Sequence, residues 1–131
     1  MIFEMTIQVR VSNIEEGRRW YETLLNKKPD FIPHDGFVEW ELIRGCWLQV
    51  AEGDMTRGNG PIRLGVTNIE AERERLINSL NIDRFEIHSR SEVPVKWGTL
   101  SDPWGNCLGF FEYLDKTEEQ ERINSIKGIE M

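Results

Sequence analysis

The segment Val11–Glu15, VSNIE, recurs almost unchanged as VTNIE at Val66–Glu70 in a chain of 131 residues. In each copy an alternating apolar stretch precedes the segment, and apolar residues at helical spacing follow it. Asn13 and Asn68 stand where the first turn of a helix needs a side-chain acceptor for a backbone N–H. The repeated pentapeptide therefore predicts two strand-to-helix connections of the same kind.

The first half of the chain predicts a strand, a helix and a hairpin. Apolar residues alternate over residues 3–11, which is typical of a strand with one buried face. The helix that follows is expected to end at Asn26. The stretches FVEWELI and CWLQVAE predict a hairpin, and residues 30–33 are a candidate for a short additional strand.

The second half predicts the same order of elements. PIRLGV predicts a strand, and EAERERLINSL predicts a helix capped by Asn68. Three further strands are expected in RFEIHSRSEV, VKWGTLS and CLGFFEYL, with a turn at DPWGN before the last. The matching order argues against coincidence. It predicts an α+β fold of two tandem βαβββ modules, residues 1–53 and 61–114, with a connector at 54–60 and a charged tail at 115–131.

Composition limits the possible partners. A formal charge of −7 would repel a phosphate backbone, and no apolar run approaches the roughly 18 residues that a membrane span requires. The N-terminus lacks a signal-peptide pattern, and two cysteines do not make a disulfide framework. We expect a cytoplasmic protein that binds neither nucleic acid nor membrane. His34 and His88 have no Cys or His partner at ligand spacing, so we expect neither to bind a metal ion.

Three stretches resemble the vicinal oxygen chelate superfamily, which includes glyoxalase I, bleomycin-resistance proteins, fosfomycin-resistance enzymes and extradiol dioxygenases. They are VRVSNIEEGRRWYETLL, LGVTNIEAERERL and WGTLSDPWGNCLGFFE, and the resemblance extends from Phe3 to Leu114. It implies that each module curls its mixed sheet into half of a cup, with the helices on the convex face. It also implies a small-molecule site inside the cup and a homodimer.

The resemblance further implies where a metal ion would bind. Metal-dependent members carry His, Gln or Glu at four inward positions, on the first and last strands of each module. In this chain the four positions are Thr6, Gln49, Pro61 and Gly109, of which only Gln49 has a ligand-type side chain. A two-residue slip would admit Gln8 but would leave the second module without ligands. We therefore expect no metal cofactor.

Strand alternation counted from these positions predicts the inner surface of the cup. It combines aromatic walls, small floors and polar groups, which suits a flat organic molecule. Trp97 and Trp104 are expected at the border of the cleft or at a dimer edge, whereas Trp20 and Trp40 are expected in the core. The predicted ligand-binding residues are Thr6, Gln8, Arg10, Trp47, Gln49, Arg63, Gly109 and Phe111.

The function expected from this surface is metal-free binding of a flat organic or antibiotic-like ligand, as in the antibiotic-binding members that the chain resembles. No catalytic residue is assigned. Two alternatives stay open at this point. One is a metal-dependent lyase, isomerase or dioxygenase of the glyoxalase type with atypical ligands. The other is an interaction module in which the cup is vestigial.

Overall fold

A computed structural model describes residue 1, residues 4–55 and residues 61–130 of the chain. The chain forms two compact units, Met1–Asn59 with Pro103–Asn106, and Gly60–Asp102 with Cys107–Met131. Most of the predicted connector, and Phe3 at the predicted start of the first strand, lie outside the described residues. None of the described helices is long and apolar enough to cross a bilayer.

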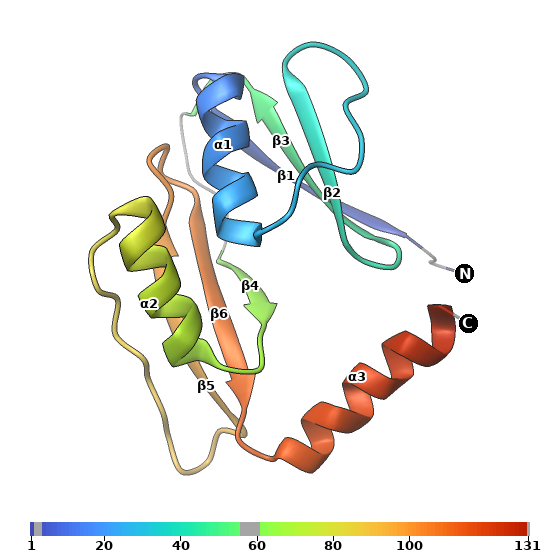
Figure 1. Ribbon diagram of the computed structural model, residues 1–131, viewed down its shortest axis with the longest axis vertical. Coiled ribbons are helices and arrows are strands. Elements are labelled where there is room, and N and C mark those ends of the chain that lie inside the picture. The colour runs from blue at the N-terminus through green and yellow to red at the C-terminus, as the bar shows by residue number, and fades with distance from the viewer. Residues whose placement is uncertain (2–3, 56–60, 131) are drawn as a thin grey trace. The chain divides into compact units, whose positions relative to one another are not determined.

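The first unit contains a three-stranded sheet and one helix (Figure 1). Its elements are β1 (Met5–Val11), α1 (Ile14–Leu25), β2 (Phe37–Ile43) and β3 (Cys46–Glu52). The sheet order is β1-β3-β2, with β1 parallel and β2 antiparallel to the central strand. The helix and the hairpin have the bounds that the sequence predicts.

The core of the first unit lies between α1 and one face of the sheet. Val9 and Val50 are fully buried there, as are Tyr21 and Trp40. The Trp40 indole N–H donates to the Lys27 carbonyl at 2.9 Å, which satisfies the one polar atom of the buried ring. Trp20 is also buried, so both tryptophans assigned to the core from the sequence lie there.

The second unit repeats this arrangement and adds a helix. Its elements are β4 (Ile62–Gly65), α2 (Ile69–Leu80), β5 (Val95–Ser101), β6 (Cys107–Tyr113) and α3 (Lys116–Glu130). The sheet order is β4-β6-β5, again with a parallel and an antiparallel neighbour for the central strand. The charged tail is thus a helix, and it contacts β6.

The additional strand predicted in each module is reduced to one bridge. Phe31 pairs only with Glu39, because prolines on both sides of the Phe31–Ile32 segment cannot donate to a ladder. In the second unit the stretch 84–93 pairs with β5 only at His88, opposite Trp97. A turn closed by the Val93 N–H and the Arg90 carbonyl ends that pairing. The strand predicted over RFEIHSRSEV is therefore wrong in length.

Helices α1 and α2 begin where the repeat predicts. The Asn13 side chain accepts from the Glu16 N–H, and the Asn68 side chain accepts from the Ala71 N–H, each at 3.0 Å. These bonds satisfy N–H groups that the first turn of a helix leaves without a carbonyl partner. Asn26 ends α1 with a φ of 53°, in the left-handed region that asparagine tolerates.

A glutamate at the end of the central sheet strand also binds each helix N-terminus. The Glu52 carboxylate accepts from the Ile14 N–H at 3.3 Å, and the Glu112 carboxylate accepts from the Ile69 N–H at 2.7 Å. Negative charge is favourable at this end of a helix. The structural repeat therefore extends beyond the pentapeptide to the residue that caps each helix from the sheet.

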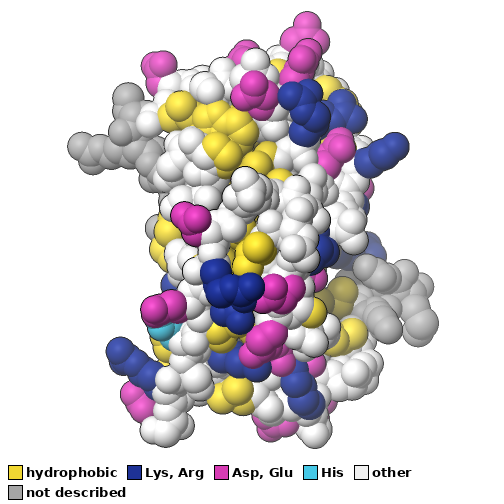
Figure 2. Space-filling model, turned by 60° about the vertical axis from the view of Figure 1, so that its left-hand side comes forward, with side chains coloured by type: hydrophobic (Ala, Val, Ile, Leu, Met, Phe, Trp, Pro, Cys, Tyr) yellow, Lys and Arg dark blue, Asp and Glu magenta, His cyan; other side chains and the backbone are white. Residues whose placement is uncertain are grey.

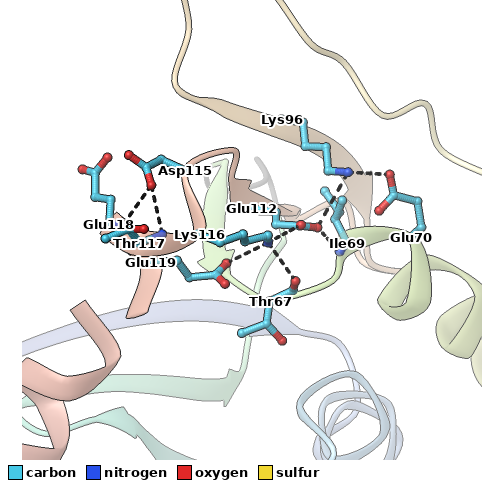
Figure 3. Close-up of polar contacts among 10 residues, drawn as sticks. All are labelled: Thr67, Ile69, Glu70, Lys96, Glu112, Asp115, Lys116, Thr117, Glu118 and Glu119. Atoms are coloured by element: carbon cyan, nitrogen blue, oxygen red, sulfur yellow. Dashed lines mark hydrogen bonds and ion pairs between the residues drawn. The ribbon is translucent and has the colours of Figure 1, made fainter. Parts of the chain in front are cut away.

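The second of these glutamates is the centre of a polar network (Figure 3). Glu112 is 6% exposed. Lys116 of α3 approaches its carboxylate at 2.5 Å, and Lys96 of β5 lies 3.9 Å from it. Lys116 also donates to the Thr67 carbonyl at 3.2 Å, and Lys96 pairs with Glu70 of α2 at 2.8 Å. One buried carboxylate thus connects β6, α2 and α3.

The DPWGN turn belongs to the first unit over Pro103–Asn106. Gly105 has a φ of 88°, as expected for this turn. Asn106 does not have a positive φ. Its side chain is buried instead and donates to the Arg10 carbonyl at 2.8 Å, while the Trp104 indole N–H donates to the Ser12 hydroxyl at 2.8 Å. The turn is therefore hydrogen-bonded to the end of β1 and to the residue that follows it.

Candidate functional site

A row of hydrogen-bonded side chains crosses the sheet face of the first unit that is opposite α1. The Arg10 Nε donates to the Gln8 Oε1 at 2.8 Å, and the Gln8 Nε2 donates to the Gln49 Oε1. The Gln49 Nε2 then donates to the Glu39 carboxylate at 2.6 Å. The row starts at a cation and ends at an anion, and every donor points toward the anion.

Sheet register explains how the row forms. Gln8 and Gln49 are direct partners across β1 and β3, and Glu39 of β2 is the partner of Gln49 on its other side. Thr6 is the partner of Trp47, one pair further along the face. The residue opposite Gln49 is therefore Gln8, two positions from the Thr6 that the family pattern indicates.

The second unit has an open pocket of about 510 Å³. Trp97 and Phe111 are direct partners across β5 and β6, so their rings project from the same side of the sheet. The Trp97 ring lies 5.6 Å from the His88 ring, and the Phe111 ring lies 5.8 Å from that of Tyr113. The residues that line the pocket are Arg63, Arg90, Val93, Val95, Trp97 and Phe111.

Two glycines make room for the side chains of this face. A Cβ atom on Gly65 would lie 2.9 Å from the Phe111 ring, so the ring occupies space that any side chain there would fill. Gly109 lies between Arg63 and Thr99 in the next row of the sheet. The Arg63 Nη2 donates to the Thr99 hydroxyl at 3.3 Å, so the guanidinium passes over Gly109.

Gly109 also lies against backbone. A Cβ atom there would stand closer than 3.0 Å to the Gly98 carbonyl oxygen and 3.3 Å from the Thr99 Cα. Glycine is therefore required at this position for close packing of β5 on β6. A side chain long enough to bind a metal ion could not be placed there without moving β5.

The predicted ligand-binding residues fall into separate groups. Arg63 and Phe111 line the pocket, and Gly109 is the floor below Arg63. The polar residues Gln8, Arg10 and Gln49 form the row in the first unit, and Thr6 and Trp47 are paired beside it. A role in ligand binding remains a prediction for all of them.

Sequence reasoning missed several residues of these faces. Glu39 could not be found by counting back from the turn, because a bulge between Glu41 and Ile43 shifts the register by one and brings Glu39, rather than Trp40, opposite Gln49. The sequence also gave no indication that Arg90, Val93 and Val95 would line a pocket. Arg90 and Val93 lie in a turn that interrupts a stretch predicted to be a strand. Trp97 was expected at the border of the cleft or at a dimer edge, and it lines the pocket.

The donor set does not fit a divalent metal ion at the positions that the superfamily uses. The side chains of Pro61 and Gly109 have no nitrogen, oxygen or sulfur atom that could bind a metal ion. The Gln49 side-chain amide already forms hydrogen bonds through both its oxygen and its nitrogen. Among the described residues, no three His, Cys, Asp or Glu side chains are grouped so that they could hold a metal ion. A divalent ion needs several oxygen, nitrogen or sulfur ligands to compete with water.

The charge of the pocket lining differs from that of the chain. The protein has 23 acidic and 16 basic residues, and both signs are interspersed on the face drawn in Figure 2. Among the residues that the structure describes, the pocket lining contains two arginines and no acidic residue. The lining therefore carries positive charge although the net charge of the chain is negative.

Solved structures with the same fold are similar to nearly the whole of this chain. A glyoxalase/bleomycin resistance protein from Catenulispora acidiphila superposes with a TM-score of 0.70 at 24% identity, over 84% of this chain and 97% of that chain. A genomically encoded fosfomycin resistance protein from Listeria monocytogenes gives 0.68 at 12% identity, over 86% and 93% of the two chains. These similarities confirm the predicted α+β fold of two βαβββ-type modules.

Comparison by sequence does not assign the chain to a family. No protein-family model matches the chain. A stretch of the pyruvate dehydrogenase E1 component from Cupriavidus necator is 27% identical over 116 residues, which are 88% of this chain. The match covers 11% of the length of that enzyme.

Proposed function

Because the chain has the fold of the vicinal oxygen chelate superfamily, we propose that it binds a planar organic molecule in the pocket of the second unit, without a metal ion. The observation that carries this proposal is the paired placement of Trp97 and Phe111 as aromatic walls of one pocket. A flat ring can stack on such walls, and the volume of about 510 Å³ lies within the range of small-molecule sites.

Polar groups at the pocket would orient the ligand. Arg63 donates one guanidinium N–H to the Thr99 hydroxyl, which leaves further N–H groups available to a ligand. The backbone of β4 supports it from below through pairing with β6. Rigid support of this kind lowers the entropy lost on binding. The homodimer and the cytoplasmic location expected from the sequence belong to the same proposal.

An antibiotic-like compound is the proposed class of ligand, because the similar structure from Catenulispora acidiphila is a glyoxalase/bleomycin resistance protein. The pocket offers aromatic surfaces for stacking and guanidinium groups as hydrogen-bond donors. Among the described residues that line it, none has a hydroxyl, thiol, imidazole or carboxyl group that could act as a nucleophile or a base. Sequestration, in which the ligand is released unchanged, therefore suits this pocket better than chemical conversion.

Trp97→Ala is expected to weaken binding of a planar probe, 2-naphthylmethanol, by about tenfold, because one stacking wall is removed. The measurement is isothermal titration calorimetry at constant salt. Phe31→Ala is the control, because it removes an exposed aromatic ring of the first unit that is not among the predicted ligand-binding residues. Equal losses in the two variants would show that the pocket is not the binding site.

Removal of metal is expected to leave binding unchanged. Protein purified without chelator should contain less than about one tenth of an equivalent of Zn, Ni, Mn or Fe, because the four inward positions supply one ligand-type side chain. Elemental analysis measures the content, and titration of 2-naphthylmethanol before and after EDTA measures the effect. One equivalent of metal, or binding abolished by EDTA, contradicts the proposal.

A further inference from the structure

We propose that the ligand of the second-unit pocket is an anion, a planar organic ring bearing a carboxylate or a similar acidic group, and that Arg63 and Arg90 bind its charge. This inference rests on the proposed function and names the chemical class of the ligand. The net charge of the chain alone would favour a neutral or cationic ligand, so the local lining and the overall charge lead to opposite expectations.

The pairing of the arginines in the second unit supports an anionic ligand. Arg73, Arg75, Arg84 and Arg122 each form an ion pair with a glutamate. Within the part of the chain that the structure describes, the two pocket arginines have no such carboxylate. An acidic chain that pairs the other arginines of this unit therefore leaves the two pocket arginines available for an external anion.

The position of each guanidinium also suits this role. The Arg63 side chain extends over Gly109 to the Thr99 hydroxyl. Its charge therefore lies on the sheet face that also carries Phe111, one row away. Arg90 lies in the turn closed by the Val93 N–H, and both of these residues line the pocket. Two planar guanidinium groups can each donate two parallel hydrogen bonds to a carboxylate.

The aromatic walls determine the rest of the ligand. A carboxylate bound by arginine at the rim leaves the attached ring to stack on Trp97 or Phe111, which are partners in one row of the sheet. A cationic ring would meet two like charges in the same pocket. The site therefore favours aromatic acids over neutral rings, and neutral rings over aromatic amines.

The test compares three probes with the same ring, 2-naphthoate, 2-naphthylmethanol and 2-naphthylmethylammonium, by isothermal titration calorimetry at low salt. We expect 2-naphthoate to bind about tenfold more tightly than the alcohol, and the ammonium more weakly than either. Added salt should reduce the preference for the acid, because these arginines are exposed to solvent.

Substitutions of the pocket arginines test whether they cause the preference for 2-naphthoate. The double substitution Arg63→Gln with Arg90→Gln should remove the preference for 2-naphthoate over the alcohol. Arg84→Gln is the control for loss of positive charge, because it removes one charge from an exposed arginine outside the pocket. Urea unfolding of each variant checks that the fold is retained.

The possible results separate this inference from the proposed function. If the three probes bind equally, or the ammonium binds most tightly, the pocket binds planar rings but the anion assignment is wrong. If the acid is preferred and Arg84→Gln removes the preference as well as the double variant does, the assignment to the pocket arginines is wrong. If no probe binds, the proposed function fails and this inference fails with it.

Discussion

Gly109→Ala is expected to lower the free energy of unfolding by about 3 kcal/mol, because overpacking against backbone is among the costly single substitutions. The new methyl group would collide with the Gly98 carbonyl oxygen and would touch the Thr99 Cα. Both belong to β5, which cannot move without breaking its pairing with β6. The measurement is urea unfolding followed by tryptophan fluorescence.

Gly53→Ala is the control for this substitution. A Cβ atom there would lie 2.6 Å from the Arg10 Nη1, the far end of a flexible side chain that can rotate away. We expect a change within about 0.5 kcal/mol, since alanine also restricts the unfolded chain. If the two variants lose the same stability, contact with the β5 backbone is not the reason for glycine at position 109.

Glu112→Gln is expected to lower the free energy of unfolding at neutral pH by about 2 kcal/mol, because a nearly buried carboxylate loses its charge-assisted bonds. Burial alone would raise the pKa of Glu112. The hydrogen bonds from Lys116 and from the Ile69 N–H, with the charge of Lys96, outweigh burial and lower that pKa below its ordinary value of 4.5.

The lowered pKa gives the sign of the pH dependence. A carboxyl whose pKa is lower in the folded state stabilises the fold above its unfolded pKa, and the contribution is lost as pH falls through the folded value. The difference between the wild-type protein and Glu112→Gln should therefore be largest above the ordinary pKa of 4.5 and should shrink as the pH falls below it. Urea unfolding at several pH values measures it.

Glu52→Gln is the matched control, because Glu52 binds the N-terminus of α1 as Glu112 binds that of α2. Glu52 is exposed and has the longer bond to its helix, so we expect a loss of about 0.5 kcal/mol or less. A pH-independent loss in Glu112→Gln would mean that shape, rather than charge, accounts for the stability of the network.

Local rules predicted the parts of the fold that depend on neighbouring residues. The alternation of FVEWELI and CWLQVAE determines which side chains share a face, and β2 and β3 have those bounds. Asn13 and Asn26 mark the ends of α1, because each satisfies a helix terminus with its own side chain or backbone conformation. The four inward positions could also be counted from the repeat.

Contacts between distant segments could not be predicted in the same way. The sequence of residues 84–93 alternates like a strand, but a single bridge to β5 and the turn after it depend on how the two segments cross. That crossing brings Arg90 and Val93 to the pocket. Arg63 and Phe111 could therefore be assigned to the surface of a strand from the sequence, whereas Arg90 and Val93 could not, because tertiary packing overrides local propensity in that turn.

The chain enters the first unit twice, once over Met1–Asn59 and again over Pro103–Asn106. Asn106 and Trp104 of the second passage donate hydrogen bonds to the Arg10 carbonyl and the Ser12 hydroxyl of the first passage. A duplicated gene would suggest two halves that can be separated at the middle of the chain. In this protein, residues 103–106 of the first unit are synthesised after residues 60–102 of the second unit. The first unit therefore cannot be completed until most of the second unit has been made.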